Sequence, residues 1–130
     1  MNGQEIRTSA TADFQQTLIA TGFPYHDYSK MKQYMSVFDY CMRNTRGLRR
    51  LGSAAADLAY VAAGRFDAFY EYGLNPWDVA AGILLVKEAG GIVTDFSGND
   101  DPISAKEILA ATTPIHHPFL EIIREQFKDY

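Results

Sequence analysis

Residues 69–82 read FYEYGLNPWDVAAG, a stretch that passes within a few residues from an aromatic run into an apolar segment. The aromatic residues up to Tyr72, with an acidic residue among them, predict a strand. A helix is predicted to follow at once, because Asn75 can cap it and Pro76 suits the first helical position, where a missing N–H costs nothing. Asp78 then occupies the third helical position. The stretch therefore predicts a strand-to-helix corner with a carboxylate at its mouth.

Two roles are open for Asp78. An Asp in the first turn opposes the positive end of the helix dipole and can bond back to the capping residue, worth roughly 0.3–1 kcal/mol when exposed. However, Glu71 lies just before Gly73, so both carboxylates can project at one corner, the place where α/β sheets bind ligands. Paired carboxylates at a helix start suit Mg²⁺, which takes a few carboxylates together with water and a substrate phosphate. The local sequence permits either a helix cap or a metal site.

A second corner is predicted in residues 49–58, RRLGSAAADL. Gly52 lets the backbone approach a ligand closely, and the N–H groups of Ser53 and Ala54 face outward from a helix start, where hydroxyl or phosphate oxygens would be favoured. The alternative is a capped helix whose small residues allow close packing. This corner by itself decides neither.

The remaining patterns alternate between strands and helices. We predict strands at 16–21, 66–72, 92–96 and 108–112, and helices at 28–42, 53–64, 76–89 and 118–127, with turns at 46–50 and 97–101. Asp27 or Ser29 could cap the first helix. Such alternation implies an α/β fold whose sheet is covered by helices on both faces.

Composition narrows the class of protein. The 130 residues are 47% hydrophobic and 13% aromatic, enough apolar material for one compact domain over 1–130. The formal net charge is -4, and no basic stripe appears that could neutralise a row of phosphates, so nucleic acid is not expected as a partner. The single cysteine, Cys41, cannot form an intrachain disulfide, which favours the cytoplasm. No apolar run reaches the ~20 residues of a membrane span, and no signal peptide pattern is present.

Three arginines, Arg46, Arg49 and Arg50, lie together in the predicted 46–50 turn. They could meet a phosphate or a neighbouring subunit, although a solvated turn is the commoner place for such a cluster. Arg49 is kept as a minor substrate-binding candidate.

Other polar residues are assigned structural roles. The His116–His117 pair lacks metal-ligand spacing and precedes Pro118 at the predicted start of the last helix, so a loop or capping role is favoured. Asp95 lies beside the SGNDD turn, where Asp and Asn bond to their own backbone, so a solvated turn position is favoured. None of these residues is predicted to bind a ligand.

Taken together, residues 49–98 resemble the C-terminal signature region of the inositol monophosphatase family, magnesium-dependent and lithium-sensitive sugar-phosphate phosphatases. The resemblance is carried by four motifs: WDVAAG at Trp77–Gly82, EAGG at Glu88–Gly91, LGSAA at Leu51–Ala55 and TGFPY at Thr21–Tyr25. It implies that the chain corresponds to the second half of that family's catalytic unit, part of a layered α/β/α/β/α sandwich.

The resemblance also implies roles for single residues. Asp78 is similar to the aspartate that helps to hold the second magnesium ion near the substrate phosphate. Glu71 resembles the glutamate that hydrogen-bonds a substrate hydroxyl. Gly52, Ser53 and Ala54 resemble the turn that meets the inositol ring. The implied ligand is a small phosphate monoester and the implied cofactor is Mg²⁺.

One part of the family pattern is missing. The family's remaining metal ligands come from an upstream glutamate and a D-P-I/L-D-G-T motif, and neither occurs in this sequence. A lone aspartate with a neighbouring glutamate should bind Mg²⁺ weakly, since this ion demands near-octahedral coordination. We therefore expect the chain to be inactive alone and to pair with a missing N-terminal half or with a second copy. The alternatives are a 3'-phosphoadenosine phosphate phosphatase of the same superfamily and a non-catalytic scaffold.

Overall fold

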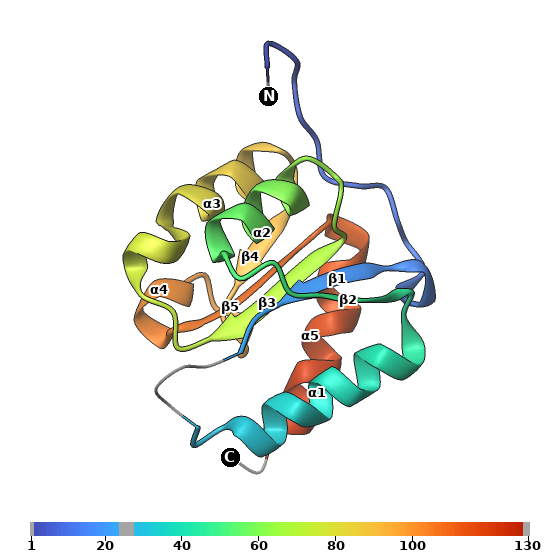
Figure 1. Cartoon of the computed structure of the whole chain (residues 1–130), viewed down its shortest axis with the longest axis vertical. Helices are drawn as coiled ribbons and strands as arrows, with labels where there is room; N and C mark the ends of the chain where they lie inside the picture. The colour runs from blue at the N-terminus through green and yellow to red at the C-terminus, as the bar shows by residue number, and fades with distance from the viewer. Residues whose placement is uncertain (1, 24–27, 129–130) are drawn as a thin grey trace.

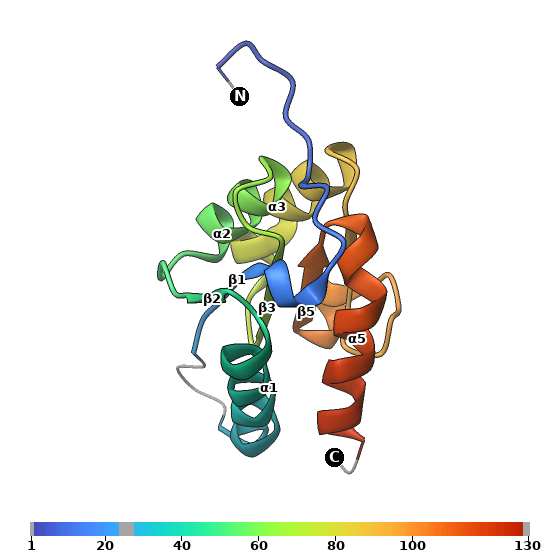
Figure 2. The same ribbon diagram turned by 90° about the vertical axis from the view of Figure 1, so that its right-hand side faces the viewer.

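A five-stranded sheet lies between two pairs of helices in the computed structural model, which describes residues 2–23 and 28–128 (Figures 1 and 2). The elements, in chain order, are η1 Phe14–Gln16, β1 Leu18–Thr21, α1 Met31–Asn44, β2 Gly47–Arg49, α2 Ala54–Ala62, β3 Ala68–Tyr72, α3 Pro76–Glu88, β4 Ile92–Thr94, α4 Pro102–Ala105, β5 Glu107–Ala111 and α5 Thr113–Phe127. Helices α2 and α3 cover one face of the sheet, and α1 and α5 cover the other.

The sheet is mixed, with strand order β2-β1-β3-β5-β4. Strand β1 is parallel to both β2 and β3, whereas β5 is antiparallel to both β3 and β4. The predicted fold class, a mixed α/β sheet flanked by helices, is confirmed. Strand β1 therefore ends at the same edge of the sheet as β3, and each of these ends lies beside the start of a covering helix.

Strand β3 is buried along its whole length, and its side chains alternate between the two faces. Ala68, Tyr70 and Tyr72 belong to the apolar cluster built with α1 and α5. Phe69 belongs to the cluster built with α2 and α3. The period of two puts Glu71 on the same face as Phe69, toward the starts of α2 and α3. Alternation along one strand thus aims a carboxylate at the predicted corner.

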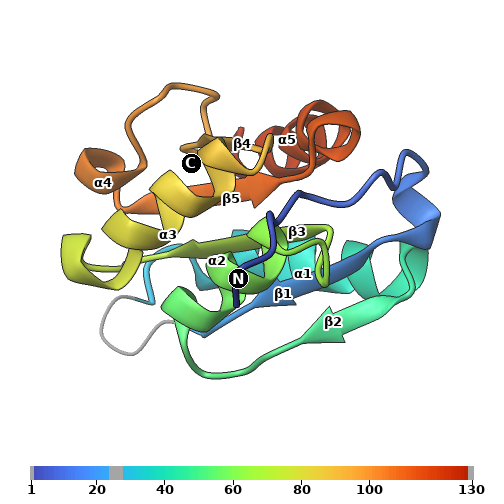
Figure 3. The same cartoon turned by 90° about the horizontal axis from the view of Figure 1, so that it is seen from above.

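Helices α2 and α3 lie side by side over the sheet (Figure 3), and glycine allows their close approach. A Cβ added at Gly82 would fall 2.5 Å from Leu58 Cβ, a distance that real Cβ atoms essentially never show. Ser53 caps α2, since its hydroxyl accepts a hydrogen bond from Ala56 N at 3.2 Å. The absence of a side chain at Gly82 therefore lets α3 pack closely against Leu58 of α2.

The segment before η1 is hydrogen-bonded to one end of the sheet, the end away from the starts of α2 and α3. Thr8 N donates to Ala89 O at 3.1 Å. The Ser9 hydroxyl donates to Asp67 Oδ1 at 2.6 Å, and the Thr112 hydroxyl donates to Ser9 O. This polar N-terminal segment therefore joins α3, β3 and the β5–α5 connection.

Two element predictions were wrong. The predicted 46–50 turn contains the edge strand β2, in which Gly47 pairs with Leu18 of β1. The last helix begins at Thr113 and not at Pro118, because a buried face that includes Ile115 and Phe119 holds the earlier turn in place. Tertiary packing thus overrides the helix-breaking tendency of an internal proline. Helix α1 begins at Met31 with Lys30 at its N-cap position, so the predicted cap Ser29 is wrong, and the other predicted cap, Asp27, lies outside the described residues.

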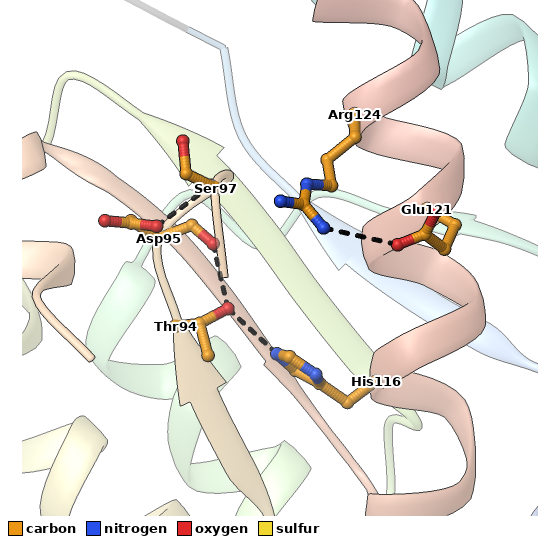
Figure 4. A network of polar contacts seen from close by, with 6 residues as sticks. All are labelled: Thr94, Asp95, Ser97, His116, Glu121 and Arg124. Atoms are coloured by element: carbon orange, nitrogen blue, oxygen red, sulfur yellow. Dashed lines mark hydrogen bonds and ion pairs between the residues drawn. The ribbon is translucent and has the colours of Figure 1, made fainter. Parts of the chain in front are cut away.

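The histidine pair and Asp95 also differ from prediction (Figure 4). His116 lies inside α5, is 6% exposed and has its Nε2 2.9 Å from Thr94 Oγ1. Asp95 does bond to its own turn, since Oδ1 accepts from Ser97 N and Asn99 N, each at 2.9 Å. It is only 5% exposed, however, so the turn is folded against the core and is not a solvated loop.

Candidate active site

A cleft of about 630 Å³ opens where β1 and β3 end and α2 and α3 begin. Its walls come from the end of β1, the segment between β2 and α2, the first turn of α2, the β3–α3 corner and Lys106. Ends of parallel strands that meet helix starts are where open α/β sheets bind ligands. The cleft therefore occupies the position expected for a binding site in such a sheet.

The structure brings five of the predicted site residues to this one cleft. Glu71, Asp78, Gly52, Ser53 and Ala54 all line it, although about twenty residues separate the two corners in sequence. Gly52 has φ +83°, a backbone conformation that favours glycine, and a Cβ there would meet open space. The turn before α2 is thus shaped by glycine and leaves room for a ligand.

The minor candidate Arg49 is not among the described residues that line the cleft. It lies on the exposed edge strand β2, and its Nη1 donates to Leu48 O at 2.9 Å. Arg50, another of the three arginines that could meet a phosphate, lines the cleft instead, together with Lys106, to which sequence reasoning assigned no role. The Arg50 guanidinium also stacks over the Phe23 ring, 5.1 Å from its centroid.

Asp78 performs the helix-capping role that the sequence permits. Its Oδ2 accepts a hydrogen bond from Asn75 N at 3.0 Å, and the residue is half-buried at the start of α3. A carboxylate has two oxygens and about four lone-pair sites, so this bond leaves capacity for a cation. Capping and metal binding are therefore compatible at Asp78.

Glu71 is packed so tightly that its surroundings control its charge. It is 6% exposed, and a Cβ added at Gly22 would fall 2.0 Å from Glu71 Oε1. Burial, followed by the charges of Asp57 and Asp78, raises the pKa of Glu71 to about 7, with the charge of Arg50 acting in the opposite direction. Near neutral pH this carboxyl can therefore either donate or accept a hydrogen bond.

Asp57 is a cleft residue that sequence reasoning missed. It lies in the first turn of α2, is 1% exposed, and has a pKa that burial raises to about 7. Its Oδ1 has no hydrogen-bond partner among the described residues. The signal in the sequence was an acidic residue within the otherwise apolar run AAADLAYVAA, where an apolar residue would be expected.

With this geometry in place, the comparison with known families is decisive. Residues 1–128 match the inositol monophosphatase family. The chain belongs to this family. The resemblance predicted from the WDVAAG, EAGG and LGSAA motifs is thus confirmed.

The curated relatives described below carry the name Nus factor SuhB. The chain is 43% identical over 126 residues to the Nus factor SuhB of Pseudomonas aeruginosa, covering 95% of this chain and 46% of the relative. It is 43% identical over 129 residues to the Nus factor SuhB of Escherichia coli, covering 99% of this chain and 48% of the relative. The chain spans about half the length of the curated relatives it matches.

Solved structures of family members have the same fold over this chain. The extragenic suppressor protein suhB of Bartonella henselae aligns with a TM-score of 0.90 at 41% identity, over 95% of this chain and 47% of that one. The inositol monophosphatase of Anabaena (Nostoc) aligns with a TM-score of 0.88 at 35% identity, over 99% of this chain and 52% of that one. The five-stranded sheet and its four long helices therefore match about half of the inositol monophosphatase fold.

The carboxylates of this cleft are of the type that Mg²⁺ prefers but do not by themselves form a metal site. Hard carboxylate oxygens from Asp57, Glu71 and Asp78 line one cleft, which is the donor type that Mg²⁺ prefers. Across residues 2–23 and 28–128, however, no three Asp, Glu, His or Cys side chains are grouped closely enough to hold a metal ion. Near-octahedral coordination would therefore require ligands from outside the described chain.

None of the helices in the described residues has both the length and the apolar character needed to cross a membrane.

Proposed function

We propose that this chain supplies the substrate-side half of a Mg²⁺-dependent phosphatase site that hydrolyses a phosphate monoester of inositol or a related sugar. The observation that carries the proposal is the single cleft in which Glu71, Asp78 and the 52–54 turn lie together. Membership of the inositol monophosphatase family supports the same reaction class. Residues 1–130 would act as one folded unit of the larger catalytic assembly.

Each residue then has a distinct task. Asp78 would hold a magnesium ion, which when bound supplies Lewis-acid stabilisation of phosphate charge and an activated water. Glu71 would hydrogen-bond a substrate hydroxyl, because its carboxyl is buried at the cleft wall and can serve as donor or acceptor. Gly52, Ser53 and Ala54 would contact the ring of the substrate, since the backbone there is open to close approach.

The cleft contains cations as well as carboxylates. Arg50 and Lys106 line it, and both are exposed to solvent. A phosphate-bearing ligand would be attracted by these side chains and repelled by Glu71, so charge alone would favour one orientation of the ligand. This arrangement supports a ligand with one anionic end and one hydroxyl-rich end.

The test is a phosphatase assay with Mg²⁺ and inositol monophosphate. The 130-residue chain alone should show no turnover, because its share of the metal ligands is incomplete. Mixing it with the N-terminal half of the Anabaena inositol monophosphatase, which has the same fold over this region, should restore activity. Robust turnover by the chain alone would overturn the half-site proposal. A comparison of inositol monophosphate with 3'-phosphoadenosine phosphate in the restored assembly would then separate the two substrate classes.

A second candidate function is that of a Nus factor, favoured by the names of the relatives at 43% identity. It requires a partner in the transcription machinery, whereas the net charge of -4 makes direct binding of nucleic acid unfavourable. An electrophoretic mobility assay with RNA, alongside a pull-down with RNA polymerase, tests this function. If Asp78→Asn leaves partner binding intact while no phosphate monoester is hydrolysed by the restored assembly, the non-catalytic function is the better account.

We further propose a cytoplasmic location and association through an apolar surface. Cys41 is buried and unpaired, which suits a reducing compartment. Two apolar side chains of α3 are exposed, Trp77 at 79% and Leu84 at 60%. Apolar side chains exposed in this way favour burial against a second copy or against the N-terminal half. Light scattering of the chain with and without that half would distinguish the two.

A further inference from the structure

Asp57 differs from the other buried aspartates because its Oδ1 has no hydrogen-bond partner among the described residues. Asp67 accepts hydrogen bonds from the Ser9 hydroxyl at 2.6 Å and from Leu18 N at 2.7 Å. Asp95 accepts two from backbone N–H groups, each at 2.9 Å. Asp57 Oδ1 has none, although the residue is 1% exposed. Among the buried aspartates of the described residues, only the one that lines this cleft therefore has a buried oxygen without a hydrogen-bond partner.

An unpaired buried oxygen of this kind indicates a missing hydrogen-bond donor. Buried polar atoms are nearly always paired, because leaving one unpaired forfeits its interaction with water and returns nothing. Leucine, alanine or another apolar residue would fill the first turn of α2 without that cost. The retained carboxylate therefore fits a donor that arrives with a ligand.

The position of Asp57 determines which part of a ligand it can meet. It lines the same cleft as Glu71, and its charge is among the causes that raise the pKa of Glu71, so the two carboxyls are electrostatic neighbours. A phosphate group brought to this wall would be repelled by both of them. A hydroxyl group can donate a hydrogen bond to either.

We propose that Asp57 is a positioning residue of this cleft, whose Oδ1 accepts a hydrogen bond from a hydroxyl group of a polyol phosphate held against Glu71. The inference rests on the proposed function and extends its substrate side by one residue. It assigns to Asp57 a share in the choice between polyol phosphates and other phosphate compounds, because only a hydroxyl-bearing ligand satisfies the buried oxygen.

The experiment measures binding and does not depend on turnover. The 130-residue chain is titrated with inositol monophosphate and, separately, with inorganic phosphate, and NMR shifts give both dissociation constants. The wild-type chain should bind inositol monophosphate more tightly. Asp57→Ala should lower this preference about tenfold while leaving the affinity for inorganic phosphate unchanged, since one hydrogen bond to a charged group is lost. Asp57→Asn, which keeps an acceptor oxygen, should restore part of the preference.

A matched control separates positioning from a purely structural effect. Asp95→Asn makes the same chemical change as Asp57→Asn at another buried aspartate, one that is not among the residues lining the cleft, and should leave the preference unchanged. If Asp57→Ala keeps the full preference, or weakens both ligands equally, the positioning role is overturned while the proposed function stands. If the wild-type chain shows no preference at all, the substrate-side half of the proposed function fails and this inference fails with it.

Discussion

The Glu71 carboxylate packs directly against the backbone of Gly22, so that a Cβ at position 22 would fall 2.0 Å from Glu71 Oε1. Gly22 directly follows the last residue of β1, and Glu71 lies on the neighbouring strand β3. The Tyr34 hydroxyl donates to Gly22 O from the opposite face of the sheet. The position of the carboxylate is therefore set by strand pairing and by the absence of a side chain on its neighbour.

Gly22→Ala should displace Glu71 and destabilise the chain. Overpacking a buried site costs about 1–3 kcal/mol, and here the methyl group would meet a buried carboxylate. Urea unfolding of the single variants and of the double variant Gly22→Ala with Glu71→Ala measures the coupling. The double variant should lose much less stability than the sum of the two, since the clash disappears with the carboxylate. Strict additivity would contradict the contact.

The stability that Asp57 and Glu71 contribute should fall as the pH rises from about 4 to about 7. Burial raises the pKa of both Asp57 and Glu71 to about 7, so the folded chain holds these protons more tightly than the unfolded chain does. The associated stability is fully present below the ordinary carboxyl pKa and is lost as the pH rises through the folded value. Asp57→Asn should therefore be more stable than wild type by about 1–3 kcal/mol near pH 8, with little difference near pH 4.

Urea unfolding at several pH values measures this effect, and an exposed aspartate supplies the control. Asp39 forms an exposed ion pair with Arg43 at 3.1 Å. Exposed pairs of this kind contribute about 0–1 kcal/mol, so the free energy of unfolding of Asp39→Asn should change with pH as that of wild type does. Equal pH dependence in wild type and Asp57→Asn would show that Asp57 is not a buried acid.

Asp78→Asn should separate the two roles of this residue. Loss of the charge at the start of α3 should cost about 0.3–1 kcal/mol in unfolding experiments, because Asn75 N can still bond to the amide oxygen. In the assembly restored with the N-terminal half, turnover should drop by on the order of 100-fold or more, since metal-ion stabilisation is worth several kcal/mol. The control is Asp101→Asn, which alters the cap of α4 outside the cleft. Equal turnover in the two variants would show that Asp78 does not hold the metal ion.

The sequence was sufficient for the features that depend on local patterns. The strand-to-helix corner at Pro76, the helix start at Ser53 and the burial of the 66–72 region follow from capping residues, small residues and aromatic spacing. The family resemblance rested on the same motifs. These features could be predicted because each is set by residues within one or two turns of the chain.

The features that were missed depend on contacts between distant segments. Strand β2 is short and holds one apolar residue, Leu48, so only its pairing with β1 makes it a strand. The early start of α5 depends on the burial of one helix face. The internal Pro118 makes this start hard to predict from the sequence. The sequence alone makes Asp57 an ordinary aspartate in the first turn of a helix. Only the fold shows that its Oδ1 is buried with no hydrogen-bond partner among the described residues. For Asp57 the local sequence offers only its place in an apolar run, which does not show whether its carboxylate is paired.

His116→Gln should make the chain less sensitive to acid. The Thr94 hydroxyl donates to Asp95 O at 2.8 Å, so its oxygen must accept from His116 Nε2 at 2.9 Å (Figure 4). Burial, followed by the charge of His117, lowers the pKa of His116, so the unfolded chain protonates this histidine more readily than the folded chain does, and the stability that His116 contributes falls as the pH drops below about 6.5. Urea unfolding between about pH 7.5 and pH 5 should therefore show that the variant gains stability relative to wild type as the pH drops. His117→Gln, at the exposed neighbour, removes only the smaller of the two causes and should keep most of the wild-type slope, whereas an unchanged slope in His116→Gln would contradict the buried neutral imidazole.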